Sequence, residues 1–188
     1  GLDADAQSVT LTAQGEVETL DANGILGHAY GHAPLWHFVQ STPLTQPGWE
    51  IRKLSRSFDS NDQLASLHTL SQQIIEAVPY RAGRTYSATS AEEALNGGFG
   101  VCQDHAQIFI AVVRAAGVPA RYISGYLMMN DRIDQDASHA WAEAHVEGLG
   151  WVGFDVSNQI SPDLRYVRVA TGLDYQGAAP ISGMRLGS

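Results

Sequence analysis

The segment that most constrains the fold of this chain begins at Cys102 and ends at Gly117-Val118-Pro119. Its apolar residues recur at helical spacing and cover much of the circumference, which predicts a buried helix. Strand-like segments follow it at 121–127, 139–146 and 151–156. Because the helices come before the strands, we predict an α+β fold in which an antiparallel sheet packs on this central helix.

Other elements are predicted on both sides of the central helix. Apolar residues at steps of three, four and seven predict an amphipathic helix over 61–78. Ser90 and Glu93 have the spacing of a capping box, so a short helix should follow them and end near Asn96. Residues 167–169 are typical of a last strand.

The first sixty residues are predicted to be extended. Residues 8–20 alternate loosely between apolar and polar types, which favours one or two short strands, and the glycines and prolines of 22–49 interrupt any long element. We therefore divide the chain into an extended N-terminal region, 1–60, a core, 61–180, and a tail, 181–188.

Composition excludes several classes of protein. The chain has 188 residues, 44% of them hydrophobic, which is enough for one domain with a buried core. Its net charge is −9, so no basic patch is available for phosphates and nucleic-acid binding is disfavoured. No apolar stretch approaches the ~20 residues of a membrane helix, and no secretory signal is evident. We expect a cytoplasmic protein with no membrane partner, and a chain without an initiator Met is consistent with a fragment.

Cys102 is the single cysteine and follows the glycine-rich residues 97–101, at the start of the central helix. A thiol attacks only as thiolate, and the free N–H groups and dipole at a helix N-terminus favour that negative charge. We therefore predict that Cys102 is a nucleophile whose own backbone N–H faces a developing oxyanion. The alternative is that Cys102 is a small buried hydrophobic residue.

His139 and Asp155 lie in two successive predicted strands. Asp155 would accept the second ring N–H of His139 and fix its tautomer, or it would instead cap a turn with Ser157 and Asn158. An even-numbered loop between these strands would place His139 and Asp155 on opposite faces of the sheet. A site that contains both therefore requires an odd-length connection or a β-bulge, and we predict one of them.

Four motifs in this order resemble the bacterial members of the transglutaminase-like superfamily, which are often described as cysteine proteases. The motifs are Gly100-Val101-Cys102-Gln103-Asp104-His105-Ala106, Gly117-Val118-Pro119-Ala120-Arg121-Tyr122 with Ser124-Gly125-Tyr126, Ser138-His139-Ala140-Trp141, and Gly150-Trp151-Val152-Gly153-Phe154-Asp155. The resemblance implies a papain-like fold with 61–180 as its catalytic core and with 1–60 as part of a preceding domain. It also implies that Cys102, His139 and Asp155 form a triad that makes and resolves a thioester.

The resemblance further implies an aromatic oxyanion donor upstream of the cysteine. No tryptophan lies in that interval, so Tyr80 and Tyr86 are the candidates. Gln103 and Trp141 are further candidates for substrate binding. Their alternatives are first-turn helix chemistry for Gln103 and packing in the core for Trp141.

No cofactor or metal is expected. His28 and His32 have i, i+4 spacing and His37 is nearby, but glycines and a proline in this segment disfavour the helix that such a zinc site needs. The aspartates within 131–136 lack the pattern of a calcium loop and are expected in a solvated loop.

The predicted function is cysteine-dependent acyl transfer on peptide or carboxamide bonds of a protein or peptide substrate. The family resemblance favours hydrolysis over cross-linking. The alternatives are acetyl transfer to an arylamine, which uses the same residue types, and a non-catalytic interaction domain with the same fold.

Overall fold

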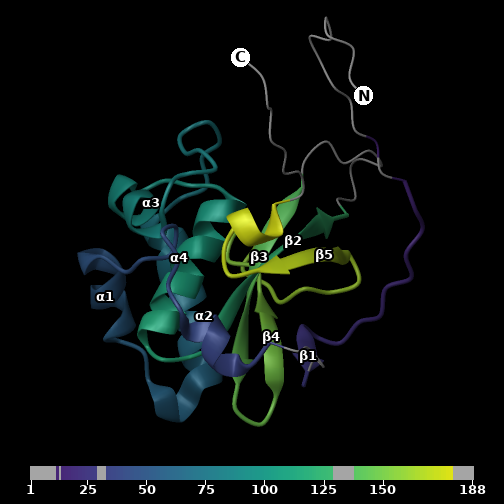
Figure 1. The fold of residues 1–188 in the computed structure, drawn as a ribbon, viewed down its shortest axis with the longest axis horizontal. Helices are drawn as coiled ribbons and strands as arrows, with labels where there is room; N and C mark the ends of the chain where they lie inside the picture. Colours follow the sequence, from purple (N-terminus) through teal and green to yellow (C-terminus); the bar gives the residue numbers. More distant parts are fainter. Residues whose placement is uncertain (1–11, 13, 29–32, 129–137, 180–188) are drawn as a thin grey trace, which may run out of the picture.

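The computed structural model describes residues 12, 14–28, 33–128 and 138–179, and its architecture is α+β, as predicted. Five antiparallel strands form one sheet in the order β1-β4-β3-β2-β5, and the helices lie on one side of it (Figure 1). The strands are β1 (Ile25–Gly27), β2 (Ala120–Leu127), β3 (His139–Val146), β4 (Gly150–Phe154) and β5 (Tyr166–Gly172). The helices are α1 (Trp49–Ser55), α2 (Gln63–Ala77), α3 (Ala91–Gly97) and α4 (Cys102–Ala115), with short 3₁₀ turns at Leu35–Val39, Ser60–Asp62 and Gln176–Ala178.

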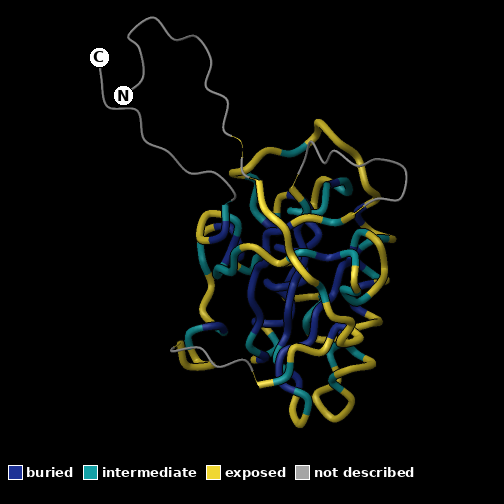
Figure 2. The backbone as a smooth tube through the Cα atoms, turned by 90° about the vertical axis from the view of Figure 1, so that its right-hand side faces the viewer, coloured by how far each residue is buried: buried dark blue, intermediate teal, exposed yellow. Residues whose placement is uncertain are grey.

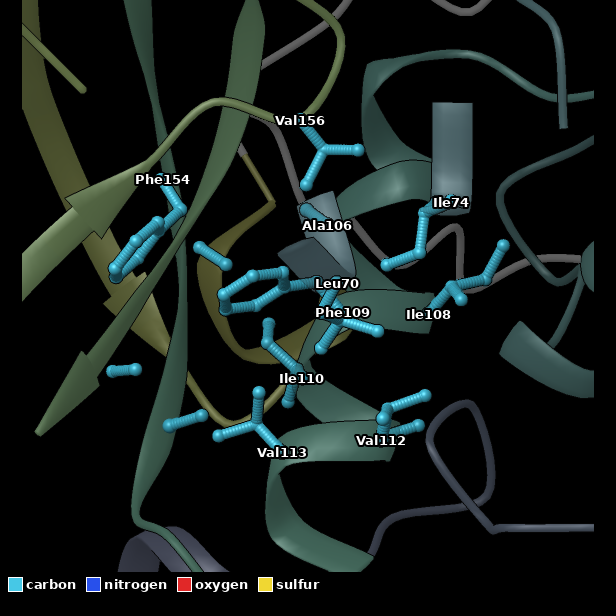
Figure 3. Packing of buried hydrophobic residues seen from close by; sticks show 14 of the residues in the cluster. Leu70, Ile74, Ala106, Ile108, Phe109, Ile110, Val112, Val113, Phe154 and Val156 are labelled. Carbon is cyan, nitrogen blue, oxygen red and sulfur yellow. The ribbon is translucent and has the colours of Figure 1, made fainter. Parts of the chain in front are cut away.

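Helix α4 is the centre of the molecule, as the sequence predicted. It contacts β2 and β3 on one side and α1, α2 and α3 on the other (Figure 1). Phe109 of α4 is fully buried and stacks on Phe154 of β4, with 5.1 Å between ring centroids (Figure 3). Burying one such side chain contributes roughly 1.5–3 kcal/mol. The tube in Figure 2 shows the same arrangement, with buried residues in the interior and exposed ones on the surrounding loops.

The two faces of the sheet have different side chains. Ala140, Ala142 and Ala144 of β3 belong to the core cluster that contains α4, and their small size lets the helix approach closely. Trp141 alternates with them and packs on the other face against Tyr166. This division of β3 follows from the alternation of side chains along a strand.

The connection between β3 and β4 has an odd length, one of the two alternatives that we predicted. Val146 pairs with Gly150, so three residues form the turn, and Glu143 pairs with Gly153. Paired residues therefore have the same parity, and His139 and Asp155 lie on the same side of the strand pair. Gly148 in this turn has a φ of 79°, a conformation that favours glycine.

Helix α1 was missed because its start is stabilised by a distant residue. The side chain of Glu92, in α3, accepts hydrogen bonds from the backbone N–H groups of Gly48, Glu50 and Ile51, at 2.9–3.1 Å. These N–H groups have no partner within their own helix. A Cβ on Gly48 would lie 2.3 Å from the Glu92 carboxyl carbon, so a larger residue here would displace the capping carboxylate. The glycine that locally suggests a loop is thus needed to seat the capping carboxylate.

The N-terminal segment differs from its prediction in detail. The described part of 8–20 forms no strand, so the strand prediction is wrong there, and β1 occurs later, at Ile25–Gly27. Strand β1 pairs with β4 alone, and this pairing depends on tertiary contact rather than on alternation of apolar and polar residues in the sequence. Since β1 joins the sheet and α1 packs on α4, the described part of 1–60 contacts the core. The division at residue 60 stays a prediction, and the tail 181–188 lies outside the described residues.

The remaining elements lie close to the positions predicted from the sequence. Helix α2 begins after Asp62, whose side chain caps it, and α3 begins at the predicted capping box of Ser90 and Glu93. The last strand is longer than the three residues expected. Within the described residues, no helix combines the length and apolar character needed to cross a bilayer.

Candidate active site

Cys102 is held at the first position of α4 by the loop before it. The buried Asp104 carboxylate accepts the Val101 N–H at 2.8 Å and the Thr85 hydroxyl at 2.6 Å, which fixes the entry of the chain into the helix. A Cβ on Gly100 would lie 2.8 Å from the Cβ of Asp104. Glycine is therefore required here so that the loop can pack against Asp104.

Cys102 is half-buried and opens onto a cavity of about 250 Å³. The cavity lies where the N-terminus of α4 meets the start of β3 and the middle of β2. It is lined by Tyr80, Val101, Cys102, Gln103, Tyr122, Ser124, Ser138, His139, Ala140 and Tyr175. The described lining residues include no Asp, Glu, Lys or Arg, so the cavity suits an uncharged polar group.

His139 lies between Cys102 and Asp155. Its Nε2 atom is 2.6 Å from Oδ2 of Asp155, and its side chain is 14% exposed. Because Nε2 is engaged with Asp155, Nδ1 is the ring nitrogen left to face the thiol. Burial lowers the pKa of His139, but hydrogen bonding and charge from Asp155 and Cys102 outweigh burial and raise that pKa to about 9.

Asp155 is fully buried and accepts several hydrogen bonds. Besides His139, the Tyr166 hydroxyl donates to Oδ2 at 2.7 Å, the Asn158 amide donates to Oδ2 at 2.7 Å, and the Asn158 backbone N–H donates to Oδ1 at 3.2 Å. Burial raises the pKa of Asp155, yet these donors together hold it below its ordinary value. Asp155 therefore has both of the contacts that we considered: it is the hydrogen-bond partner of His139, and it caps the turn that contains Asn158.

His105 joins the first turn of α4 to the turn that follows β4. It is completely buried, with Nε2 2.7 Å from the Val78 carbonyl and Nδ1 2.7 Å from the Ser157 hydroxyl. A carbonyl can only accept, so Nε2 carries the proton and Nδ1 accepts from Ser157. Burial lowers the pKa of His105, which agrees with this neutral form. The bridge fixes the helix of Cys102 relative to Asp155.

Residues 52–156, more than half of the chain, match the core of the transglutaminase-like superfamily. The chain belongs to this superfamily. Its relatives include uncharacterized proteins of Mycobacterium bovis and Mycobacterium tuberculosis, each 38% identical over 128 residues that cover 63% of this chain and 41% of theirs. A protein-glutamine gamma-glutamyltransferase of Pseudomonas aeruginosa is 27% identical over 150 residues, covering 66% of this chain and 22% of that protein.

Solved structures of the superfamily share the fold. A protein described as "Putative Cysteine Protease" from Cytophaga hutchinsonii aligns with a TM-score of 0.67 and 28% identity, over 85% of this chain and 55% of its own. The periplasmic domain of TgpA from Pseudomonas aeruginosa aligns with a TM-score of 0.52 and 25% identity, over 68% and 50%. This chain thus spans about half the length of these two structures. Because one of them is a periplasmic domain, a cytoplasmic location for this chain stays a prediction.

The other predicted site residues of this transglutaminase-like chain lie at different distances from the cavity. Tyr80 and Gln103 line it. Tyr86 is 78% exposed and is absent from the lining, although its carbonyl accepts a hydrogen bond from Gln103 at 3.4 Å. Trp141 is 2% exposed and stacks on His139 with 6.3 Å between ring centroids, so it supports the imidazole from behind.

Four residues near the site were missed by sequence reasoning. Tyr122 and Ser124 pair with Ala142 and Ala140 across β2 and β3, so alternation along β2 could have found them once the register was known. Tyr175 and Tyr166 come from the last segment of the core and carry no local signal. Burial raises the pKa of Tyr80 and Tyr122, with the charges of Cys102 and Asp104 adding to the effect, so both phenols keep their protons at neutral pH.

His28 and His37, two of the histidines considered for zinc, are absent from the lining of this cavity. His28 is exposed, and its ring is 6.2 Å from that of His145 on β3. His32 and the aspartates of 131–136 lie outside the described residues. Across the part of the chain that the structure describes, no three His, Cys, Asp or Glu side chains gather in a way that would hold a metal ion.

Proposed function

We propose that this chain is a cysteine-dependent acyl-transfer enzyme that cleaves peptide or carboxamide bonds through a thioester on Cys102, with hydrolysis as its main outcome. The observation that carries the proposal is the position of His139, hydrogen-bonded to the buried Asp155 on one side and interacting with Cys102 on the other, at the wall of an accessible cavity. Membership of the superfamily supports the same chemistry.

The first step is activation of the thiol. With a pKa of about 9, His139 is protonated at neutral pH. An imidazolium next to the sulfur favours the thiolate, and so do the free N–H groups at the start of α4. Asp155 supports the imidazolium because its carboxylate faces Nε2 at 2.6 Å. The proposed reaction therefore begins from the thiolate form of Cys102, beside this imidazolium.

The second step is formation of the thioester. The sulfur of Cys102 attacks the carbonyl carbon, the C–S bond forms, and the carbonyl electron pair moves onto oxygen. The backbone N–H of Cys102 and the phenol of Tyr80, which lines the cavity, are the proposed donors to this oxyanion. His139 then gives its proton to the leaving nitrogen, the C–N bond breaks, and an amine leaves.

The third step regenerates the enzyme. His139, now neutral, takes a proton from a water molecule that attacks the thioester carbon. The C–S bond breaks, a carboxylic acid is released, and the sulfur and imidazole return to the ion pair. If an amine replaces water, the product is a new amide and the reaction is a transamidation. The names of the similar proteins include both a protease and a glutamyltransferase.

The test is substrate profiling with a library of peptides and glutaminyl amides, each offered with and without an added primary amine. We expect release of ammonia or a peptide fragment, with carboxylic acid as the main product even when the amine is present. Cys102→Ala should remove this activity while leaving the fold intact. Activity that persists in Cys102→Ala, or amide product in excess of acid, would overturn the proposed chemistry or its hydrolytic outcome respectively.

Two competing functions are distinguished by simpler observations. Acetyl transfer to an arylamine predicts a mass increase on Cys102 after exposure to acetyl-coenzyme A, which hydrolysis of peptide bonds does not. A non-catalytic interaction domain predicts that Cys102 reacts with iodoacetamide no faster than a free thiol. The proposed ion pair instead predicts rapid alkylation at pH 6, where a free thiol is almost entirely protonated.

A further inference from the structure

One oxygen of Asp155 serves three donors at once. Oδ2 accepts from Nε2 of His139 at 2.6 Å, from the Tyr166 hydroxyl at 2.7 Å and from Nδ2 of Asn158 at 2.7 Å. Donors that share one acceptor compete for its electron density, so the hydrogen bond to His139 is weaker than it would be with Asp155 alone. Tyr166 and Asn158 thus influence His139 through an atom that they share with it.

The surroundings of Tyr166 make its hydroxyl a hydrogen-bond donor to Asp155. It starts β5, pairs with Leu127 of β2, and is 7% exposed. Its ring packs edge-on against Trp141, with centroids 5.4 Å apart, and lies 6.0 Å from the ring of His139. Burial and the charge of Asp155 raise the pKa of Tyr166 above its ordinary value. The phenol therefore keeps its proton at neutral pH, and a carboxylate leaves it only the donor role.

We propose that Tyr166 is a positioning residue of the site: through its hydrogen bond to Asp155, its hydroxyl limits how strongly the carboxylate attracts the imidazole proton of His139. The role rests on the proposed function, because a cysteine enzyme needs an imidazolium that both persists beside the sulfur and gives up its proton to the leaving nitrogen. A carboxylate with fewer donors would hold the imidazolium proton too firmly for the second task.

Among the groups around His139, Tyr166 is the one that fits this role. The titratable groups near the imidazole are Cys102 of α4, Asp155 after β4, Tyr166 of β5, and the cavity tyrosines Tyr80, Tyr122 and Tyr175. Among the described contacts of Asp155, Tyr166 is the titratable donor other than His139. Asn158 is neighbouring in sequence and also forms the turn, so its removal would disturb the backbone as well.

The experiment is the titration of His139 by NMR in the intact chain, with its signals identified by their loss in His139→Gln. In Tyr166→Phe, Asp155 loses a donor and attracts the imidazole proton more strongly, so the midpoint of His139 should move upward by about one pH unit. A merely structural role predicts the opposite direction, since a displaced carboxylate would leave His139 without its partner. An unchanged or lowered midpoint would overturn the proposal.

A second variant covers the case in which Tyr166→Phe fails to fold. Site-specific replacement of Tyr166 by 3-fluorotyrosine keeps the hydroxyl and makes it a stronger donor, so the midpoint of His139 should move downward. No shift, or an upward one, would count against the proposal. Tyr126→Phe is the matched control, because it makes the same chemical change on the neighbouring strand at a 40% exposed position, and it should leave the titration unchanged.

These measurements separate the positioning role from the enzymatic proposal. The titration of His139 requires no substrate, so it can succeed even if no peptide is cleaved. If cleavage is found, Tyr166→Phe should lower kcat and leave KM nearly unchanged, because the hydroxyl touches Asp155 and not the cavity. An equal kcat in the variant would show that the firmer hold on the proton has no kinetic consequence and would remove the functional part of the proposal.

Discussion

The interaction of His139 with Asp155 predicts a specific dependence of stability on pH, which Asp155→Asn should remove. The pKa of His139 in the folded chain is about 9, well above the ordinary value of 6.5. Folding therefore binds the imidazole proton more tightly. The resulting stabilisation is fully present below pH 6.5, and it is lost as the pH rises through about 9.

The magnitude follows from the same two pKa values. Their difference corresponds to about 3 kcal/mol of folding free energy. The His139 side chain is 14% exposed and Asp155 is fully buried, so screening by solvent reduces this value little. Cys102 supplies part of the effect and Asp155 the larger part, because the hydrogen bond and charge of Asp155 each exceed those of Cys102.

The assay is urea unfolding at a series of pH values from 6 to 10 for the natural chain and for Asp155→Asn. We expect the free energy of unfolding of the natural chain to exceed that of the variant by about 2–3 kcal/mol at pH 6, and this excess to shrink between pH 6.5 and 9.5. Cys102 is present in both proteins, so the comparison isolates the effect of Asp155. Parallel curves for the two proteins would refute the reasoning.

Three further predictions concern the fold and are measured by urea unfolding at pH 7. Phe109→Ala should destabilise the chain by about 3–5 kcal/mol, because Phe109 is fully buried and stacks on a second ring; a cost under 1 kcal/mol would contradict this packing. Ser90→Ala removes the capping box of α3 and should cost about 1 kcal/mol, whereas no change would show that the cap is dispensable. Glu143→Gln should cost about 3–5 kcal/mol, because Glu143 is fully buried and pairs with the guanidinium groups of Arg121 and Arg168 at 2.6 and 3.0 Å; unchanged stability would argue against a net contribution from this cluster.

The parts of the fold that depend on local pattern were predictable. The period of 3.6 in α2 and α4 and the alternation in β3 each follow from one continuous segment, so they could be read without knowing the neighbours. The requirement that His139 and Asp155 share one face predicted an odd connection or a β-bulge between β3 and β4, and the structure has the odd connection. The expected chemistry of the site therefore restricted the register of β3 and β4, which strand propensity alone does not determine.

The parts that depend on tertiary partners were not predictable. Helix α1 begins because Glu92, more than forty residues away in sequence, accepts its free N–H groups. Strand β1 exists because β4 offers a free edge. Tyr166 reaches Asp155 only after β5 has paired with β2, so nothing in the sequence around Tyr166 marks it as part of the site.

The residues of the candidate site likewise include some that were predictable from the sequence and some that were not. Cys102, His139 and Asp155 stood out because their residue types and order match a known chemistry, and the structure brings them together. Of the tentative residues, Tyr80 and Gln103 reach the cavity, whereas Tyr86 and Trp141 are absent from its lining. A rule such as an aromatic residue upstream of the cysteine selects the residue type but not which of two tyrosines the loop turns inward.

The central claim, that the sulfur of Cys102 carries the acyl group, is tested most directly by trapping the intermediate. The chain is mixed with an activated acyl amide, quenched in acid within seconds, and analysed by intact and peptide mass spectrometry. We expect an increase equal to one acyl group on the peptide that contains Cys102, at high occupancy in the natural chain and greatly reduced in His139→Gln. Turnover of the substrate with no such adduct, or an adduct that forms equally well without His139, would contradict the account.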